Sequence, residues 1–107
     1  MISFSEFQKM ELVVGEVKEC RLHPNADRLL LLRVSVGDGE KQIVAGIREH
    51  YSPEEIVGKK VVVLNNLEPV TLRGERSEGM VLAGTNSSGT VVLLTVDRDI
   101  EPGSKIS

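Results

Sequence analysis

One irregular segment, residues 65–80, carries side chains that could recognise a charged partner. It follows an apolar run at 61–64 and contains Arg73, Arg76 and the hydroxyl of Ser77. Guanidinium groups form paired hydrogen bonds with phosphates, so this composition predicts contacts with a phosphate backbone. One proline and two glycines make the segment too irregular for a helix, and its polarity excludes a core position. We therefore expect a binding loop presented by a rigid β-scaffold.

Catalytic and metal-binding patterns are hard to find elsewhere in the chain. His23 and His50 stand beside turn signals without the spaced cysteine, histidine or carboxylate partners of a metal site, so both are expected to be surface histidines. The serine near the end of segment 65–80 lacks the preceding glycine of a nucleophile elbow. Residues 37–39 lack the lysine of a phosphate-binding loop. We expect no catalytic site, no metal and no cofactor.

The totals describe one small domain, residues 1–107, and count against a strong general nucleic-acid binder without excluding a local basic face. The net charge is −3 and the pI about 5.4, whereas nucleic-acid-binding domains are usually basic. Aromatic residues make up 3% of the chain, too few for a base-stacking platform. Cys20 is the only cysteine, which fits a reducing compartment. Since no apolar run reaches membrane length and the start lacks signal-peptide features, we expect a cytoplasmic protein.

The elements that must position the loop are mainly strands. Valine-rich or alternating segments predict strands at 12–22, 29–36, 40–45, 60–65 and 90–96, and a short edge strand in the tail at 101–106. Gly15 predicts a bulge or sharp bend in the first strand. Leu29 and Leu31 lie on the outward register of the second strand.

Two short helices complete the expected architecture. Ser3 and Glu6 have the spacing of a capping box and predict a helix at the N-terminus. Ser52 and Pro53 open a second helix, between the third and fourth strands. The fold class is therefore all-β, a five-stranded OB-fold barrel with a short helix between strands 3 and 4 and a short N-terminal helix.

Several basic residues fall where such a barrel would expose them: Arg28, Arg33, Lys41, Lys59, Lys60, Arg73 and Arg76. Brought together, these residues could form a patch that faces phosphates. Composition alone favours the simpler interpretation, a solvated surface with scattered charges.

Motifs along almost the whole chain resemble, in order, those of the tRNA-binding domain family. They lie at 7–15, 23–29, 42–47, 51–54, 58–61, 66–80 and 102–103. The resemblance implies an OB barrel that binds tRNA non-catalytically by its shape and phosphates. It also implies tRNA as a partner, a homodimer, and service as an accessory to a methionyl-type aminoacyl-tRNA synthetase.

Carried over by motif, the implied tRNA-facing residues are Arg28, Lys41, Lys59, Asn66, Arg73, Ser77 and Met80. Arg73 would contact phosphate, and Asn66 and Ser77 would donate or accept hydrogen bonds. For the side chain of Met80, support of the core is the slightly favoured interpretation.

The chain departs from the family pattern at three positions. Glu16 and Glu68 stand where members often have lysine, and Ala45 replaces a common serine. Each glutamate reverses a charge where phosphate would lie, so tRNA binding could be weaker or the partner different. The alternative is a polypeptide-binding chaperone, because secretion chaperones in this family hold unfolded chains on the same barrel. Outward Leu29 and Leu31 would serve that surface or a dimer interface.

Overall fold

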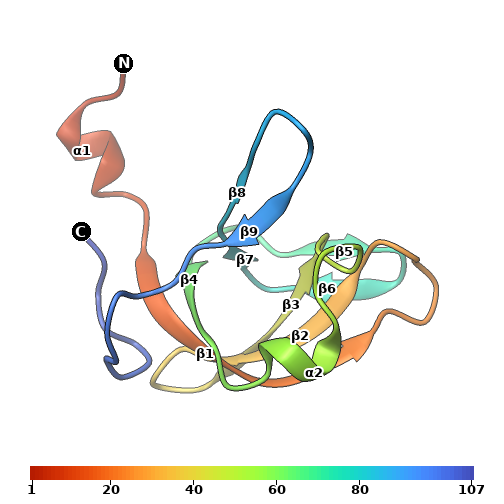
Figure 1. The fold of residues 1–107 in the computed structure, drawn as a ribbon. Coiled ribbons are helices and arrows are strands. Elements are labelled where there is room, and N and C mark those ends of the chain that lie inside the picture. Colours follow the sequence, from red (N-terminus) through yellow and green to blue (C-terminus); the bar gives the residue numbers. More distant parts are fainter.

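Strands rich in valine and leucine build the central sheet of the computed structural model, which describes residues 1–107. The elements are α1 (Phe4–Phe7), β1 (Leu12–Leu22), β2 (Leu30–Ser35), β3 (Glu40–Ala45), α2 (Pro53–Ile56), β4 (Lys60–Leu64), β5 (Val70–Leu72), β6 (Glu75–Ser77), β7 (Met80–Val81), β8 (Ala83–Thr85) and β9 (Val91–Leu93). Five antiparallel strands in the order β3–β2–β1–β4–β7 form a nearly closed barrel (Figure 1). The expected OB-type barrel is confirmed.

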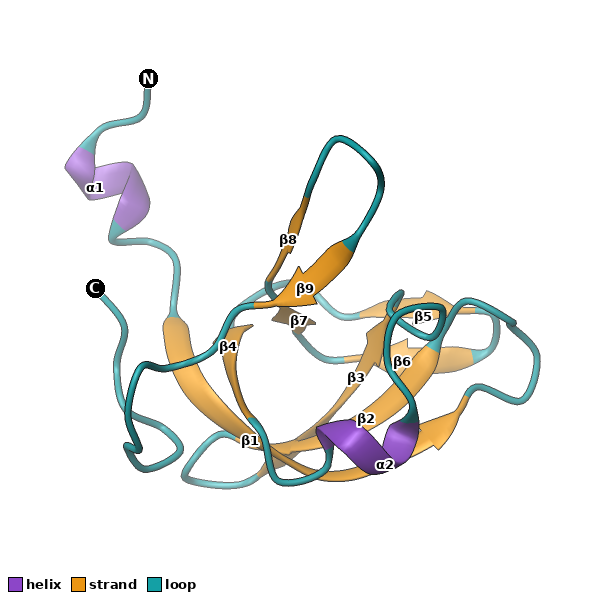
Figure 2. Cartoon of the chain, viewed as in Figure 1, coloured by secondary structure: helices purple, strands orange, loops and turns teal.

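The core lies inside this barrel and follows from the alternation of each strand. Leu30, Leu32 and Val34 of β2 point inward and are almost completely buried, as are Val61 and Val63 of β4. Burial of each such side chain contributes about 1.5–3 kcal/mol relative to exposure. The short helix α2 adds a fully buried Ile56 to the same cluster, and Figure 2 shows this helix against the strands of the barrel.

The long strand β1 pairs on both sides, with β2 and with β4. An added Cβ at Gly15 would lie 2.6 Å from Val34 Cγ1 and 2.8 Å from Val63 Cγ2, so glycine is required there by close packing. The irregularity in the pairing of β1 with β2 lies between Val17 and Glu19. The bulge predicted at Gly15 therefore lies further along β1, and this glycine instead allows the neighbouring strands to pack closely.

The tail and the fifth strand differ in how well they were predicted. The tail lies along the start of β1, through Val14 N–H to Ser104 O at 2.9 Å and Gly103 N–H to Val14 O at 2.7 Å, but it forms a single β-bridge where an edge strand was expected. The segment 90–96, expected as the fifth barrel strand, instead forms β9 of a separate hairpin with β8. The fifth place in the barrel belongs to β7, because Val81 and Met80 pair with the last residues of β4.

Segment 65–80 is more regular than predicted, since β5 and β6 form a hairpin within it. Leu72 pairs with Glu75, which leaves Arg73 and Gly74 as a two-residue turn with positive φ at both positions. Such turns match the twist of the two strands they join. None of the helices has the length and apolar character needed to span a bilayer.

Candidate functional site

Five of the seven arginines lie around one end of the barrel, and Arg33 lies next to them in the middle of β2. They lie on the connection between β1 and β2 and its flanks, on the segment after β3, and on the β5–β6 hairpin: Arg21, Arg28, Arg33, Arg48, Arg73 and Arg76. Figure 1 shows the β1–β2 connection and the β5–β6 hairpin on the same side of the molecule. We call this group, with the backbone that carries it, the arginine end.

His23 joins the two loops of the arginine end and is only 2% exposed. Its Nδ1 accepts a hydrogen bond from Asn25 N–H at 3.0 Å, so the ring proton lies on Nε2, which donates to Leu72 O at 3.0 Å. A buried imidazole thus connects the turn after β1 to the hairpin. The expectation of a surface histidine was wrong, because the contact with Leu72 bridges residues far apart in the sequence.

Two arginines hold the turn after β1 through its backbone carbonyls. Arg48 Nη1 donates to Ala26 O at 2.9 Å and His23 O at 3.3 Å, and Arg73 Nη2 donates to Asn25 O at 3.1 Å. A carbonyl satisfies a guanidinium N–H without neutralising its charge. The two arginines therefore order the loops and still present a net positive charge to an anion.

The remaining arginines of this end are either loosely paired or unpaired. Arg28 lies 3.5 Å from Glu49 and Arg33 lies 3.3 Å from Glu40, and all four side chains are well exposed. Exposed pairs of this kind are weak and readily exchanged. The side chains of Arg21 and Arg76 form no ion pair or hydrogen bond within the chain. These two guanidinium groups are available to a partner.

The predicted contact residues are not all brought together. Arg28 and Arg73 both belong to the arginine end. Lys41 Nζ donates to Asn65 O at 2.7 Å, and Lys59 is exposed at the start of β4, beside Val17 of β1. Lys41 and Lys59 therefore lie apart from the two arginines.

Two predicted residues with polar side chains hold the loop in place. The hydroxyl of Ser77 accepts from Val44 N–H at 2.9 Å and donates to Gly79 O at 3.0 Å, and this residue is 3% exposed. The amide of Asn66 accepts from Glu11 N–H at 2.9 Å and donates to Lys9 O at 2.7 Å. These bonds fasten segment 65–80 to β3 and to the N-terminal segment.

The exposure of two apolar side chains was predicted wrongly. Met80 is 42% exposed, so the preference for core support was wrong. Leu31 is 3% exposed although its register faces outward, and it cannot form the exposed interface expected of it. Sequence alternation identifies the face of a sheet, but only the tertiary structure shows which side chains on that face are covered.

An apolar hollow of about 430 Å³ lies beside Met80, between the end of β3 and the β7–β8 segment. Its lining combines residues 44–47 with residues 80–83, Thr85 and Val91. No local pattern predicted this hollow, because its two walls are more than thirty residues apart in the chain.

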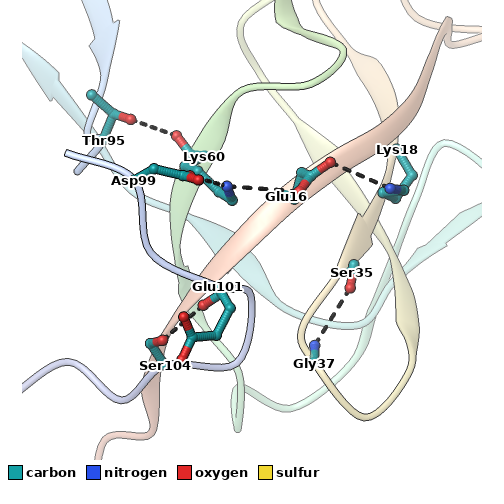
Figure 3. Close-up of polar contacts among 9 residues, drawn as sticks. All are labelled: Glu16, Lys18, Ser35, Gly37, Lys60, Thr95, Asp99, Glu101 and Ser104. Atoms are coloured by element: carbon teal, nitrogen blue, oxygen red, sulfur yellow. Dashed lines mark hydrogen bonds and ion pairs between the residues drawn. The ribbon is translucent and has the colours of Figure 1, made fainter. Parts of the chain in front are cut away.

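Glu16, expected to face a partner, is used inside the chain. Lys60 Nζ lies 3.7 Å from one oxygen of Glu16 and also donates to Asp99, while Lys18 Nζ lies 3.3 Å from the other oxygen of Glu16 (Figure 3). The hydrogen bond with Asp99 raises the pKa of Lys60, and the same bond lowers the pKa of Asp99. The charge of Glu16 is thus largely balanced by two lysines.

Sequence reasoning omitted Arg21, Arg33, Arg48 and Arg76 from the contact residues, although it placed Arg33 and Arg76 in a wider patch. Arg21 and Arg48 lie outside every segment with a binding signal. Arg21 is marked only by its closeness to residues 23–29 in the sequence. Arg48 is marked by its closeness to these residues in space, which is visible only in the folded chain.

Comparison with known proteins supplies a family and several relatives. Residues 12–105 match the family described as "Putative tRNA binding domain". The chain is 50% identical over 105 residues to a methionine–tRNA ligase of Methanocaldococcus jannaschii, which covers 98% of this chain and 16% of that protein. A methionine–tRNA ligase of Thermotoga maritima is 48% identical over 106 residues, which cover 99% and 17%. The chain thus spans about one sixth of the length of these curated relatives.

Two solved structures resemble the whole chain. A "MetRS related protein" from Pyrococcus horikoshii superimposes with a TM-score of 0.94 and 32% identity, covering 100% of this chain and 98% of that one. The "chaperone CsaA" of Bacillus anthracis gives a TM-score of 0.91 and 33% identity, covering 100% and 99%.

Proposed function

The chain belongs to the tRNA-binding domain family, and we propose that it binds tRNA at the arginine end. The observation that carries this proposal is the gathering of six arginines from four separate stretches of sequence on an acidic chain. Such a local basic surface attracts a polyanion even when the net charge is negative. The other acidic surfaces would repel the tRNA and so orient its approach.

Binding would rest on phosphate contacts made by preorganised arginines. Arg76 offers an unpaired guanidinium group, while Arg28 would exchange its exposed partner Glu49 for phosphate. Arg73 keeps its position through Asn25 O and contacts phosphate with its remaining donors. Lys59 and Met80 stay predicted contacts since both are exposed, whereas Lys41, Asn66 and Ser77 support the loop.

The biological role follows from the relatives as a proposal. The family is a binding domain, so the chain would contribute affinity for tRNA while a separate catalytic unit charges it. That unit would be a methionyl-type synthetase, to which this domain is an accessory, either joined to it or as a free-standing protein. A cytoplasmic location is consistent with this role and with the single free cysteine.

A filter-binding assay with tRNA, duplex DNA and unfolded protein tests the proposal. Affinity for tRNA should exceed that for DNA of equal length and should fall steeply from about 50 to 200 mM salt, because phosphate contacts release counterions. Equal binding of any RNA hairpin, or binding that ignores salt, would contradict docking by shape and charge.

We also propose a homodimer in which two barrels present one composite face to tRNA. Figure 1 shows α1 projecting away from the barrel, and Phe4 at its start is 72% exposed. Met1 and Ile2 before it are exposed as well. A four-residue helix with exposed apolar side chains needs a covering surface. Light scattering at micromolar concentration decides between a dimer and the 11.7 kDa monomer.

The apolar hollow beside Met80 supports a second candidate function, the binding of unfolded polypeptide. Its wall of valine, isoleucine and leucine suits apolar side chains of an extended chain, and the structural neighbours include a chaperone. Suppression of aggregation of a heat-denatured protein would measure this activity. Ala83→Asp, which places a charge on the wall of this hollow, should abolish it and leave binding at the arginine end intact.

A further inference from the structure

A second hollow, of about 510 Å³, lies on the outer face of β1, β2 and β3. The strand register forms two cross-strand rows on this face: Glu19 beside Arg33 beside Gln42, and Arg21 beside Leu31 beside Val44. All of these residues except Val44 line the hollow, together with Cys20 and Leu32. The hollow is therefore a built feature of three paired strands, with polar groups around an apolar floor.

The polar groups of the hollow are unevenly satisfied. Gln42 Nε2 donates to Arg76 O at 2.9 Å and Glu75 Oε1 at 3.3 Å, which fixes the amide and leaves its Oε1 as an open acceptor. Glu19 and Arg21 form no ion pair or hydrogen bond through their side chains. A carboxylate, an amide oxygen and a guanidinium plane thus face the same space without partners.

The charge of the hollow argues against a phosphate as its occupant. Glu19 offsets Arg21, and Glu40 offsets Arg33 at 3.3 Å. A nearly neutral hollow with an apolar floor favours a planar, uncharged ligand with N–H donors.

We propose that this hollow receives one unstacked guanine base of the bound RNA. Arg21 would stack its guanidinium plane on the base, a role that arginine fills where aromatic side chains are missing. The Glu19 carboxylate would accept hydrogen bonds from N1–H and the 2-amino group, and Gln42 Oε1 from the second amino hydrogen. The inference rests on the proposed binding of tRNA and adds a base-reading subsite to it.

Glu19→Gln provides the decisive test, because the sign of its effect on tRNA affinity separates base recognition from purely electrostatic binding. Removing an acid from an RNA-facing surface strengthens purely electrostatic binding. If Glu19 reads a base, the substitution should instead weaken tRNA binding about 5- to 150-fold, as loss of one paired base contact does. The salt dependence should stay unchanged, since no phosphate contact is lost. Glu68→Gln is the matched control, an exposed acid outside the hollow, and should bind equally or more tightly.

A second measurement identifies the occupant without tRNA. Backbone amide resonances of Arg21, Leu31 and Gln42 should shift with guanosine monophosphate and much less with cytidine monophosphate or inorganic phosphate. Equal shifts with all three would make the hollow an anion site and overturn the proposal. The proposal would also be overturned if Glu19→Gln bound tRNA as tightly as wild type or more tightly, even if the free nucleotide binds. Failure of the wild-type chain to bind tRNA would instead defeat the proposed function.

Discussion

The arginine end and the opposite end of the barrel are both fastened by polar side chains, but they use different acceptors. At the arginine end, Arg48 and Arg73 donate to backbone carbonyls. At the opposite end, which we call the terminal end (Glu16, Lys60 and the tail 97–107), Lys60 binds the carboxylates of Glu16 and Asp99 (Figure 3). A cation bound to a carbonyl keeps its charge for an outside anion, whereas one bound to two carboxylates is neutralised.

The two ends also differ in how deeply their fastenings are buried. His23 is almost fully buried between the turn and the hairpin, while Asp99 lies in solvent. A buried bond that loses one partner leaves an unsatisfied group at full cost, but an exposed pair is replaced by water. The first end should therefore be sensitive to substitution, and the second to salt and pH.

The largest expected effect comes from removing the imidazole at the arginine end. His23→Ala deprives Leu72 O and Asn25 N–H of their partners and leaves a cavity, so it should lower the free energy of unfolding by about 2–4 kcal/mol. Urea denaturation measures this loss. His50→Ala is the matched control, an exposed histidine without a side-chain bond, and should change stability by less than about 0.5 kcal/mol. Equal effects would show that burial does not distinguish the two histidines.

Next in size is the contribution of an arginine to binding. Arg73→Ala should weaken tRNA binding by about 1–3 kcal/mol, the value of a charge-assisted hydrogen bond to phosphate. Stability should change little, because the bond to Asn25 O is exposed. Lys105→Ala, which removes an unpaired cation from the terminal end, should leave affinity unchanged. A similar loss of affinity in both variants would mean that tRNA does not distinguish the two ends.

Sterics at the terminal end should affect stability alone. An added Cβ at Gly103 would lie 2.9 Å from Val36 O at a φ of +90°, so Gly103→Ala should destabilise the fold by about 1–3 kcal/mol. Gly89 has a similar φ of +85° with open space around it, and Gly89→Ala should cost only about 1 kcal/mol. The difference between their melting temperatures isolates the clash. Reduced tRNA affinity of folded Gly103→Ala would place the tail in the binding site.

The smallest effect is the pH dependence of the terminal end. Lys60 lowers the folded-state pKa of Asp99 below its ordinary value of 3.8, so the pair stabilises the fold above that pH and less as the pH falls through the lowered pKa. The raised pKa of Lys60 gives stability below its ordinary value of 10.5 that is lost at more alkaline pH. Melting temperatures of Asp99→Asn should vary less with pH than those of wild type. Asp97→Asn, whose ion pair is exposed, should follow wild type.

Local patterns predicted the elements well and their partners less well. β1 and β3 begin and end at the expected residues, and α2 lies between β3 and β4 as predicted. The fifth barrel strand was misassigned, because 90–96 has a stronger strand pattern than the two residues of β7. Pairing with β4 depends on what the preceding hairpin leaves free, and no local propensity encodes that.

What the sequence determined by itself is the barrel class and the family, since alternation, turn signals and ordered motifs are local properties. Only the tertiary structure decided which charged groups act together. It balanced Glu16 with Lys60 and Lys18, buried His23 and Ser77, and gathered arginines from residue 21 to residue 76 around two loops. The physical reason is that charge interactions and burial depend on distance in space, and contacts such as that between His23 and Leu72 join residues that are 49 positions apart.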